Sequence, residues 1–415
     1  MSVLEELLKK HCPDGVEYVP IGSLMERVKE KGKDDLNVKQ VYVVSNTRGI
    51  VRSEDYHDNS IHSDDTSNYT ILKQDMFAYN PSRLNIGSIG RLKSTISGLV
   101  SPMYVVFSVD KSVVDVKYFE YFLKSPKIIN KIDSLKEEGA RFRFDYNRWN
   151  WISIPLPPIE VQKEIVRILD TFTKYQDLLN RELELRKKQY EYYRDKLLTF
   201  TEGTQSCGDE VEWKILNEVI ISLNTGLNPR QFFRLNTDDA KNYYVTIREL
   251  QNNTIKFSEK TDKINDEALK LCNKRSNLEV GDVLFSGTGT IGETAIIDKF
   301  PSNWNIKEGI YSIKPNKSFL VPKFLMYLLK SSYIRDIYLA KADGGTVKSV
   351  PMKEMRNLKI PIPPLEEQER IVNILDKFDA LCNDITRGLP AEIELRKKQY
   401  EYYRDKLLTF KEKKK

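Results

Sequence analysis

Two short segments of this chain resemble catalytic motifs, and each lacks a part that its chemistry requires. Residues 287–292 read GTGTIG, which satisfies the G-x-G-x-x-G fingerprint of dinucleotide binding and follows an apolar run. That fingerprint must open a helix whose N-terminus meets the phosphates, whereas the ETAIID that follows predicts a strand. Residues 80–83, NPSR, begin like the N-P-P-[YF] motif of DNA amino-methyltransferases but lack the second proline and the aromatic residue. We expect neither dinucleotide binding nor methyl transfer at these positions.

Residues for metal or nucleotide hydrolysis are also missing from the sequence. The three histidines, His11, His57 and His62, form no H-x-x-x-H pair, and no G-x-x-x-x-G-K-[ST] loop for ATP occurs. The four cysteines are scattered singly, which is typical of a reducing cytoplasm, and no stretch of 18 apolar residues predicts a membrane span. We therefore predict a cytoplasmic chain that is not an enzyme and binds no cofactor itself.

Basic and aromatic residues interleave in the segment 140–151, ARFRFDYNRWNW. Arginine can fork onto guanine or bind phosphate, so this pattern is compatible with DNA binding. The alternative is that the aromatic residues belong to the core of a strand and the arginines are solvated. The net charge of +6, from 66 basic and 60 acidic residues, is too slight to decide between them.

The equivalent segment of the second half is 344–355, GGTVKSVPMKEM, and further polar residues lie in loops after expected strands. For any one of them, an ordinary surface position is as good an interpretation as contact with a base. The candidate DNA-binding residues are Asn46, Arg48, Asn80, Arg83, Arg91, Arg141, Arg143, Arg148, Arg248, Ser286, Thr288, Lys348 and Ser349.

The elements that must position these residues are duplicated. Residues 184–200 read ELRKKQYEYYRDKLLTF, and residues 394–410 repeat them letter for letter. Similar lead-ins, IPLPPIEVQ from residue 154 and IPIPPLEEQ from residue 360, precede the two copies. The chain is therefore a pseudo-twofold duplication, which suits a target with two similar but non-identical ends, such as duplex DNA.

Apolar residues recur with alternating steps of four and three from Ile165 to Phe200, which predicts a coiled-coil helix of about 40 residues. The alternative is an amphipathic helix that lies on a domain. Tyr190, Tyr193 and Leu197 with Tyr400, Tyr403 and Leu407 form identical seams that would match when run antiparallel. Residues 388–390, GLP, fall within a four-residue insertion in the second copy, so we expect a break near Gly388 and a restart around Pro390.

The fold class that follows is α/β: two similar α/β domains separated by two long helices that pair as an antiparallel coiled coil. Strand-like runs such as KQVYVVS and MYVVFSV, with a helix near residues 118–135, form the first domain. The expected segments are residues 1–153 (first domain), 154–200 (first helical spacer), 201–210 (linker), 211–359 (second domain) and 360–415 (second helical spacer).

The doubled PLPPIEVQ and PIPPLEEQ lead-ins, the doubled YEYYRDKLL and the variable domains between them resemble the specificity subunit of type I restriction-modification systems. The resemblance covers nearly the whole chain. It implies two target-recognition domains, each reading one half of a bipartite sequence in double-stranded DNA. It also implies docking of methyltransferase subunits, two being the natural number, and of restriction subunits that translocate and cut. S-adenosylmethionine, ATP and Mg²⁺ would belong to those subunits.

Two readers on one face of B-DNA would centre on half-sites about one turn, roughly 34 Å, apart. Two alternatives stay open on the sequence. One is a recognition subunit of another multisubunit restriction system, and the other is a coiled-coil scaffold whose α/β domains bind proteins. The co-purifying partner separates the first alternative from the resemblance, and the salt dependence of DNA binding separates the second.

Overall fold

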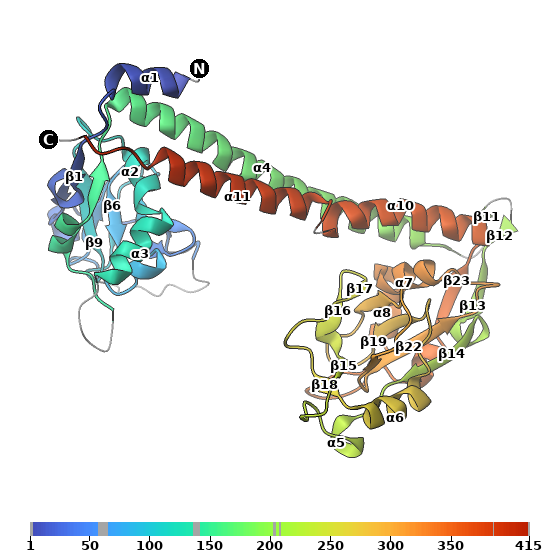
Figure 1. The fold of residues 1–415 in the computed structure, drawn as a ribbon. Coiled ribbons are helices and arrows are strands. Elements are labelled where there is room, and N and C mark those ends of the chain that lie inside the picture. The colour runs from blue at the N-terminus through green and yellow to red at the C-terminus, as the bar shows by residue number, and fades with distance from the viewer. Residues whose placement is uncertain are drawn as a thin grey trace. The chain divides into compact units, whose positions relative to one another are not determined.

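A computed structural model describes residues 3–56, 65–135, 142–201, 205–206, 209–384 and 386–413. The chain forms two compact units, one of Met1–Leu178 with Glu394–Lys415 and the other of Leu179–Ile393. Each unit contains one α/β domain and two segments of long helix (Figure 1). The domain and its helices therefore come from parts of the chain that are far apart in sequence.

The domain of the first unit is built on two four-stranded sheets. One is antiparallel, in the order β2-β9-β6-β7, and the other has the order β4-β3-β8-β5, in which β3 and β8 run parallel. Valine, isoleucine, phenylalanine and tyrosine dominate the central strands, as fits a pleated, buried surface. The strands are β2 (Met25–Arg27), β3 (Val41–Ser45), β4 (Gly49–Arg52), β5 (Thr70–Leu72), β6 (Phe77–Tyr79), β7 (Ile89–Arg91), β8 (Gly98–Val100) and β9 (Val105–Val109).

Aromatic side chains fill the core of this domain. Phe77 stacks on Phe107 with ring centroids 5.3 Å apart, and Phe119 meets Phe77 edge-on at the same distance. The helices are α1 (Val3–His11), α2 (Val116–Leu123) and α3 (Pro126–Ser134). The single helix expected near residues 118–135 is thus two helices, because Pro126 disfavours helical geometry at Ser125 and begins α3.

The domain of the second unit has the same architecture despite its different sequence. Its antiparallel sheet has the order β14-β22-β19-β20, and its second sheet, β18-β15-β21, again contains one parallel pair, β15 and β21. The strands are β14 (Ile220–Thr225), β15 (Asn242–Val245), β16 (Leu250–Gln251), β17 (Thr254–Ile255), β18 (Lys263–Ile264), β19 (Val283–Ser286), β20 (Thr294–Ile296), β21 (Trp304–Ile306) and β22 (Ile310–Pro315).

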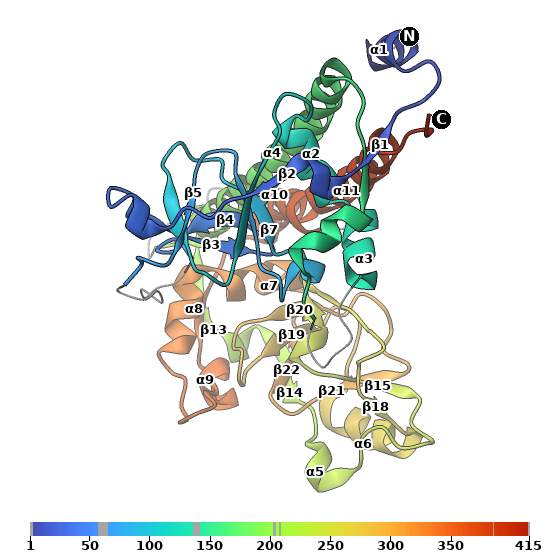
Figure 2. The same ribbon diagram turned by 90° about the vertical axis from the view of Figure 1, so that its left-hand side faces the viewer.

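Helices cover these strands at several places. In α6 (Asp266–Ser276), Ser276 and Asn273 hydrogen-bond Asn305 of β21, so the helix lies against the second sheet (Figure 2). The remaining helices of this domain are α5 (Pro229–Phe232), α7 (Pro322–Lys330), α8 (Ser332–Leu339) and α9 (Met352–Arg356). The fold class expected from the sequence, two similar α/β domains with long helices, is confirmed.

Each proline-rich lead-in begins as a strand of its domain. β10 (Ser153–Pro155) pairs with β1 (Tyr18–Pro20), and β23 (Lys359–Ile362) pairs with β13 (Glu212–Ile215). The domain ends expected at residues 153 and 359 therefore fall inside these strands. The pairing carries the chain directly from a sheet of the domain into a long helix.

The long helices differ in continuity, as the insertion predicts. α4 (Ile159–Leu198) runs unbroken for 40 residues, whereas the second copy is divided into α10 (Leu365–Asn383) and α11 (Leu389–Leu407). A Cβ on Gly388 would lie 2.5 Å from the Ala380 carbonyl oxygen and 2.7 Å from that of Asp384. Glycine is therefore required where the chain packs closely against the last carbonyl groups of α10. The break expected near Gly388 is confirmed.

The helices pair antiparallel within each unit (Figure 1). In the first unit, Phe172 of α4 stacks on Tyr403 of α11 with centroids 5.4 Å apart. In the second unit, Tyr193 of α4 stacks on Phe378 of α10 at 5.5 Å. The sequence led us to expect the two repeated seams to pair with each other, but each pairs with the earlier part of the other copy's helix. The two stacks use equivalent residues in exchanged order, as a pseudo-dyad requires. Leu197 and Tyr190 pack on the core of the second domain, and Leu407 and Tyr400 on that of the first.

Candidate nucleic-acid interface

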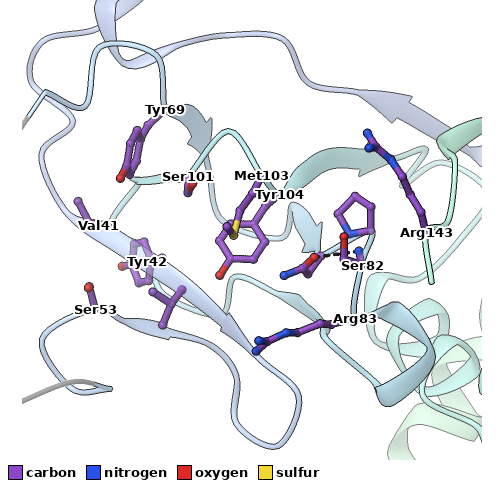
Figure 3. Close-up of a pocket in the computed structure, with 13 residues that line it drawn as sticks. Val41, Tyr42, Ser53, Tyr69, Ser82, Arg83, Ser101, Met103, Tyr104 and Arg143 are labelled. Atoms are coloured by element: carbon purple, nitrogen blue, oxygen red, sulfur yellow. Dashed lines mark hydrogen bonds between the residues drawn. The ribbon is translucent and has the colours of Figure 1, made fainter. Parts of the chain in front are cut away.

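The loop after β6 forms one wall of a cavity of about 750 Å³ in the first domain (Figure 3). The Asn80 side-chain oxygen accepts a hydrogen bond from the Ser82 amide at 2.9 Å, and the Arg83 amide donates to the Asn80 carbonyl at 3.0 Å. These bonds form an Asx turn that fixes the loop. The residues that line the cavity are Val41, Tyr42, Val43, Ser53, Tyr69, Asn80, Pro81, Ser82, Arg83, Ser101, Met103, Tyr104 and Arg143.

The segment around Arg143 lies beside this loop, because the Phe144 amide donates to the Pro81 carbonyl at 3.0 Å, and Arg143 also lines the cavity. Arg83 and Arg143 are exposed, and neither side chain is paired with a carboxylate among the described residues. Two cations beside a concave polar surface form an arrangement that can bind phosphate or the edge of a guanine.

In the segment of interleaved basic and aromatic residues, which the structure describes from residue 142 to 151, some aromatic side chains belong to the core and others are exposed. Phe144 and Trp149 are buried in the core, in and beside a 3₁₀ helix (Tyr146–Trp151) rather than the expected strand, whereas Trp151 is 63% exposed. The Arg148 guanidinium donates to the Leu135 carbonyl and lies over the Trp151 ring, 5.6 Å from its centroid. Arg148 is thus engaged within the domain. Arg141 lies outside the described residues.

Arg91 is inside the domain, so we remove it from the candidates for DNA contact. It is 8% exposed and forms ion pairs with Asp75 at 2.6 Å and with Glu120 at 3.0 Å. Burial acts to raise the pKa of Asp75, but hydrogen bonds and charge from Lys111 and Arg91 outweigh it and lower that pKa. The sequence misled because an arginine at a strand end looks the same whether or not carboxylates face it.

Asn46 and Arg48 lie in the exposed turn between β3 and β4. The Ser45 hydroxyl accepts from the Thr47 and Arg48 amides, both at 3.2 Å, and the Arg48 guanidinium donates to the Asp55 carbonyl at 3.0 Å. Neither residue lines the cavity. The turn is therefore a separate polar surface of the same domain.

Two loops that are separate in sequence meet in the second domain. The Val350 amide donates to the Gly287 carbonyl at 2.8 Å, which is the counterpart of the bond between Phe144 and Pro81. The Gly289 amide donates to the Lys348 carbonyl at 2.9 Å, and the Thr288 and Ser349 hydroxyls are 2.9 Å apart. The structure thus brings together three candidates, Thr288, Lys348 and Ser349.

Other candidates of the second domain have internal partners. Ser286 is fully buried, and its hydroxyl donates to the Thr290 carbonyl and accepts from the Glu293 amide. It therefore shapes the loop and offers nothing to a ligand. The Arg248 guanidinium, 59% exposed, forms an ion pair with Asp262 at 2.8 Å.

The glycine-rich motif at residues 287–292 joins β19 to β20, so a strand follows it, as predicted. A Cβ on Gly287 would lie 2.3 Å from the Tyr311 ring, and Gly289 has a φ of +80°. The glycines thus allow close packing and a turn in a hairpin, and they open no phosphate-binding helix.

Sequence reasoning missed the tyrosines of the first cavity. Tyr42, Tyr69 and Tyr104 come from different strands and turns, and only the folded sheets bring them beside Arg83. Alternation along β3 could have shown which side Tyr42 faces, but not what it faces.

Within the described parts of the chain, no three histidine, cysteine, aspartate or glutamate residues gather as a metal site would require. None of the helices placed by the structure is long and apolar enough to cross a bilayer.

The structure thus contains two domains of one fold, each presenting fixed polar loops and each joined to long helices. The family described as the type I restriction modification DNA specificity domain matches residues 13–186 and 209–395. The chain belongs to this family and contains two copies of its domain. It is a DNA sequence-recognition subunit of a type I restriction-modification system.

Named relatives agree with this assignment. The chain is 31% identical to the Escherichia coli type I restriction enzyme EcoR124I/EcoR124II specificity subunit, over 99% of this chain and 97% of the relative. A putative type I specificity subunit of Haemophilus influenzae is 35% identical over 62% of this chain and 64% of its own length.

Solved structures show the same fold. The crystal structure of the HsdS subunit from Thermoanaerobacter tengcongensis has a TM-score of 0.52 at 17% identity and covers 96% of this chain and 97% of its own. A chain from work on complex assembly and conformational transition of the type I R-M system has a TM-score of 0.65 at 16% identity, covering 96% and 98%.

Proposed function

We propose that this chain reads a bipartite sequence in double-stranded DNA, with one half-site for each domain. The observation that carries the proposal is that the two domains present equivalent loops at equivalent places. We call these the reader loops; they follow β6 in the first domain and β19 in the second. In each domain, the loop after the third strand of the antiparallel sheet is joined by backbone hydrogen bonding to the segment that leads into the domain's last strand, β10 or β23. The frame is the same, while the side chains on it differ, so each domain would recognise different bases.

In the first domain the proposed contacts are Asn80, Arg83 and Arg143 at the cavity and Asn46 and Arg48 at the turn. In the second domain they are Thr288, Lys348 and Ser349, with Arg248. Lys348 is exposed and has no carboxylate partner among the residues described. Phosphate contacts would orient each domain, and contacts to base edges would supply specificity.

The exact repeat supports docking of two copies of one partner, which we propose is the methyltransferase subunit. Helix pairing requires only the seam residues, yet exposed positions are also identical. Leu185 and Leu395 are 55% and 62% exposed, and Tyr192 and Tyr402 are 60% and 62% exposed. In each copy the two residues are seven apart and lie on one helix face. Two identical apolar stripes on the outside of the helices fit two identical binding surfaces.

The chain itself would catalyse nothing. S-adenosylmethionine for methylation, and ATP and Mg²⁺ for translocation and cleavage, would be bound by the methyltransferase and restriction subunits. We place the complex in the cytoplasm, in keeping with the free cysteines Cys12, Cys272 and Cys382.

Exchange of one domain tests this proposal. Residues 1–150 would be replaced by the corresponding domain of a relative, and the methylated motif would be mapped with the same methyltransferase. We expect one half of the motif to change and the other to stay. A change in both halves would refute independent reading by the two domains.

A further inference from the structure

The proline-rich lead-in of each long helix ends in a glutamine that clamps the helix to its domain. Gln162 is fully buried. Its side-chain oxygen accepts from the Asp115 amide at 2.8 Å, and its side-chain nitrogen donates to the carbonyls of Val113 at 2.9 Å and Pro157 at 2.7 Å. The clamp thus joins the first turn of α4 to the loop before α2.

Gln368, also fully buried, repeats the clamp in the second half. It accepts from the Val321 amide and donates to the carbonyls of Phe319 and Pro363, each at 2.8 Å. A primary amide is suited to this role because it offers two donors and an acceptor without charge. The same three bonds form in two domains whose sequences otherwise differ.

The glutamine clamp is the first anchor of each domain, and a second anchor lies eight residues further along each helix, at Asp170 and Asp376. Asp170 accepts from Lys117 at 2.6 Å and from the Tyr121 hydroxyl at 2.8 Å, both on α2. Asp376 accepts in the same way from Lys323 at 2.5 Å and the Tyr327 hydroxyl at 2.7 Å, both on α7. The lysine and tyrosine are identical in two helices that diverge at nearly every other position.

Two anchors constrain a domain more than one. One attachment leaves a pivot, whereas two attachments about 12 Å apart, at about 1.5 Å per residue, also fix the angle between domain and helix. Neither anchor includes a residue of the reader loops. A shift of about 3.4 Å along DNA equals one base pair. A recognition domain must therefore be held more tightly than that if the number of base pairs between the two half-sites is to be fixed.

We propose that Gln162 and Gln368, with the anchors Lys117-Tyr121-Asp170 and Lys323-Tyr327-Asp376, are positioning residues that set the gap between the two half-sites. The inference rests on the proposed function, because it requires a bipartite target. The anchors govern how far apart the readers act, while the loops govern which bases are read.

The test uses the full chain co-expressed with its methyltransferase, and sequencing of the host genome for modified bases. In the double variant Lys117→Met with Tyr121→Phe, we expect the same two half-sites to be methylated. Methylation at gaps one base pair longer or shorter should rise at least tenfold over the wild-type chain. The control is Arg167→Ala, which breaks an ion pair with Glu164 inside the same helix and touches neither anchor. The control should keep the wild-type gap.

Gln162→Ala probes the buried anchor in the same assay and should also broaden the gap. If that variant fails to fold, the partly exposed pair Lys117 and Tyr121 decides the question. An unchanged gap in a folded double variant, with a normal melting transition, would overturn the inference, as would a change in the bases read. A wild-type chain that gives no split motif would instead contradict the proposed function.

Discussion

At the scale of single residues, the arginines of the first domain separate by their partners. Arg91 is enclosed by two carboxylates, whereas Arg83 and Arg143 border a cavity without one among the described residues. An arginine that is neutralised inside a fold contributes to stability, and one that is left unneutralised at a concave surface remains available to a ligand. The two kinds therefore predict opposite mutational results.

Replacing Arg83 or Arg143 by alanine should weaken DNA binding by the complex without lowering its melting temperature. If the arginine contacts guanine, its loss should cost about 1–3 kcal/mol of binding free energy and relax specificity at one position of the first half-site. A phosphate contact would instead weaken all sequences and reduce the slope of log affinity against log salt by about 0.9. Binding titrations at several salt concentrations distinguish the two. Wild-type affinity and slope in both variants would remove these arginines from the interface.

Arg91→Ala should unfold the first domain more easily and leave the recognised bases unchanged. Loss of one partner of a buried ion pair costs about 3 kcal/mol at neutral pH. The lowered pKa values of Asp75 and Glu120 mean that this stability is present above their ordinary pKa and is lost as the pH falls through the folded pKa. The difference in free energy of unfolding between variant and wild type, measured by denaturant unfolding, should therefore become smaller below about pH 4. A relaxed half-site would show instead that Arg91 reaches DNA.

At the scale of elements, the aromatic stacks between helices can be tested separately from the outer face. Tyr193→Asp with Tyr403→Asp places a charge in each stack and should destabilise helix pairing by about 2 kcal/mol. Leu185→Asp with Leu395→Asp is the matched control, since those side chains are exposed, whereas Tyr192 and Tyr402 contact Tyr193 and Tyr403 edge-on. The control should keep the melting temperature and lose methyltransferase binding. An unaltered melting temperature in the first pair would contradict the seam.

The break between α10 and α11 makes a prediction about the gap in the target. Deletion of residues 388–391 removes four residues, equal to about 6 Å of helix, and restores the length of the first copy. We expect the undefined gap to shorten by one or two base pairs, at about 3.4 Å each. Mapping the methylated motif measures this directly. An unchanged gap would show that helix length does not set it.

The long helices and their break could be predicted because their signals are local. Heptad spacing marks the seam of α4, and glycine followed by proline marks the break. Strand runs such as Val41–Ser45 were visible for the same reason. The division at Pro126 is also a local signal, but the apolar periodicity of both helices obscured it.

Within each domain, contacts between residues far apart in the sequence could not be predicted, because they depend on the order of the strands in the sheets. Nothing in the sequence links Pro81 to Phe144, or Gly287 to Val350, until the sheets form. The same holds for the two carboxylates around Arg91. The motif P-x-P-P-[IL]-x-x-Q was recognised as a mark of the family, but its glutamine gained a physical role only when its buried partners were seen.

At the scale of the whole molecule, one frame carries two different readers. Among the described residues, the first presents the guanidinium groups of Arg83 and Arg143, without a carboxylate partner, beside a tyrosine-lined cavity. The second presents the hydroxyl groups of Thr288 and Ser349, glycine backbone and Lys348. The repeated helix sequence and the anchor residues are shared by the two halves, although the second helix is broken near Gly388. This division between a repeated frame and variable loops explains how a duplicated chain would recognise a target with unlike halves.

The most direct test of this account is to co-express the chain with its methyltransferase in a methylation-free host and to sequence the genome for modified bases. The account predicts a split motif of two short defined halves around a fixed undefined gap. A continuous motif would mean that only one domain reads DNA. An intact complex that leaves the genome unmethylated would contradict the reader role altogether.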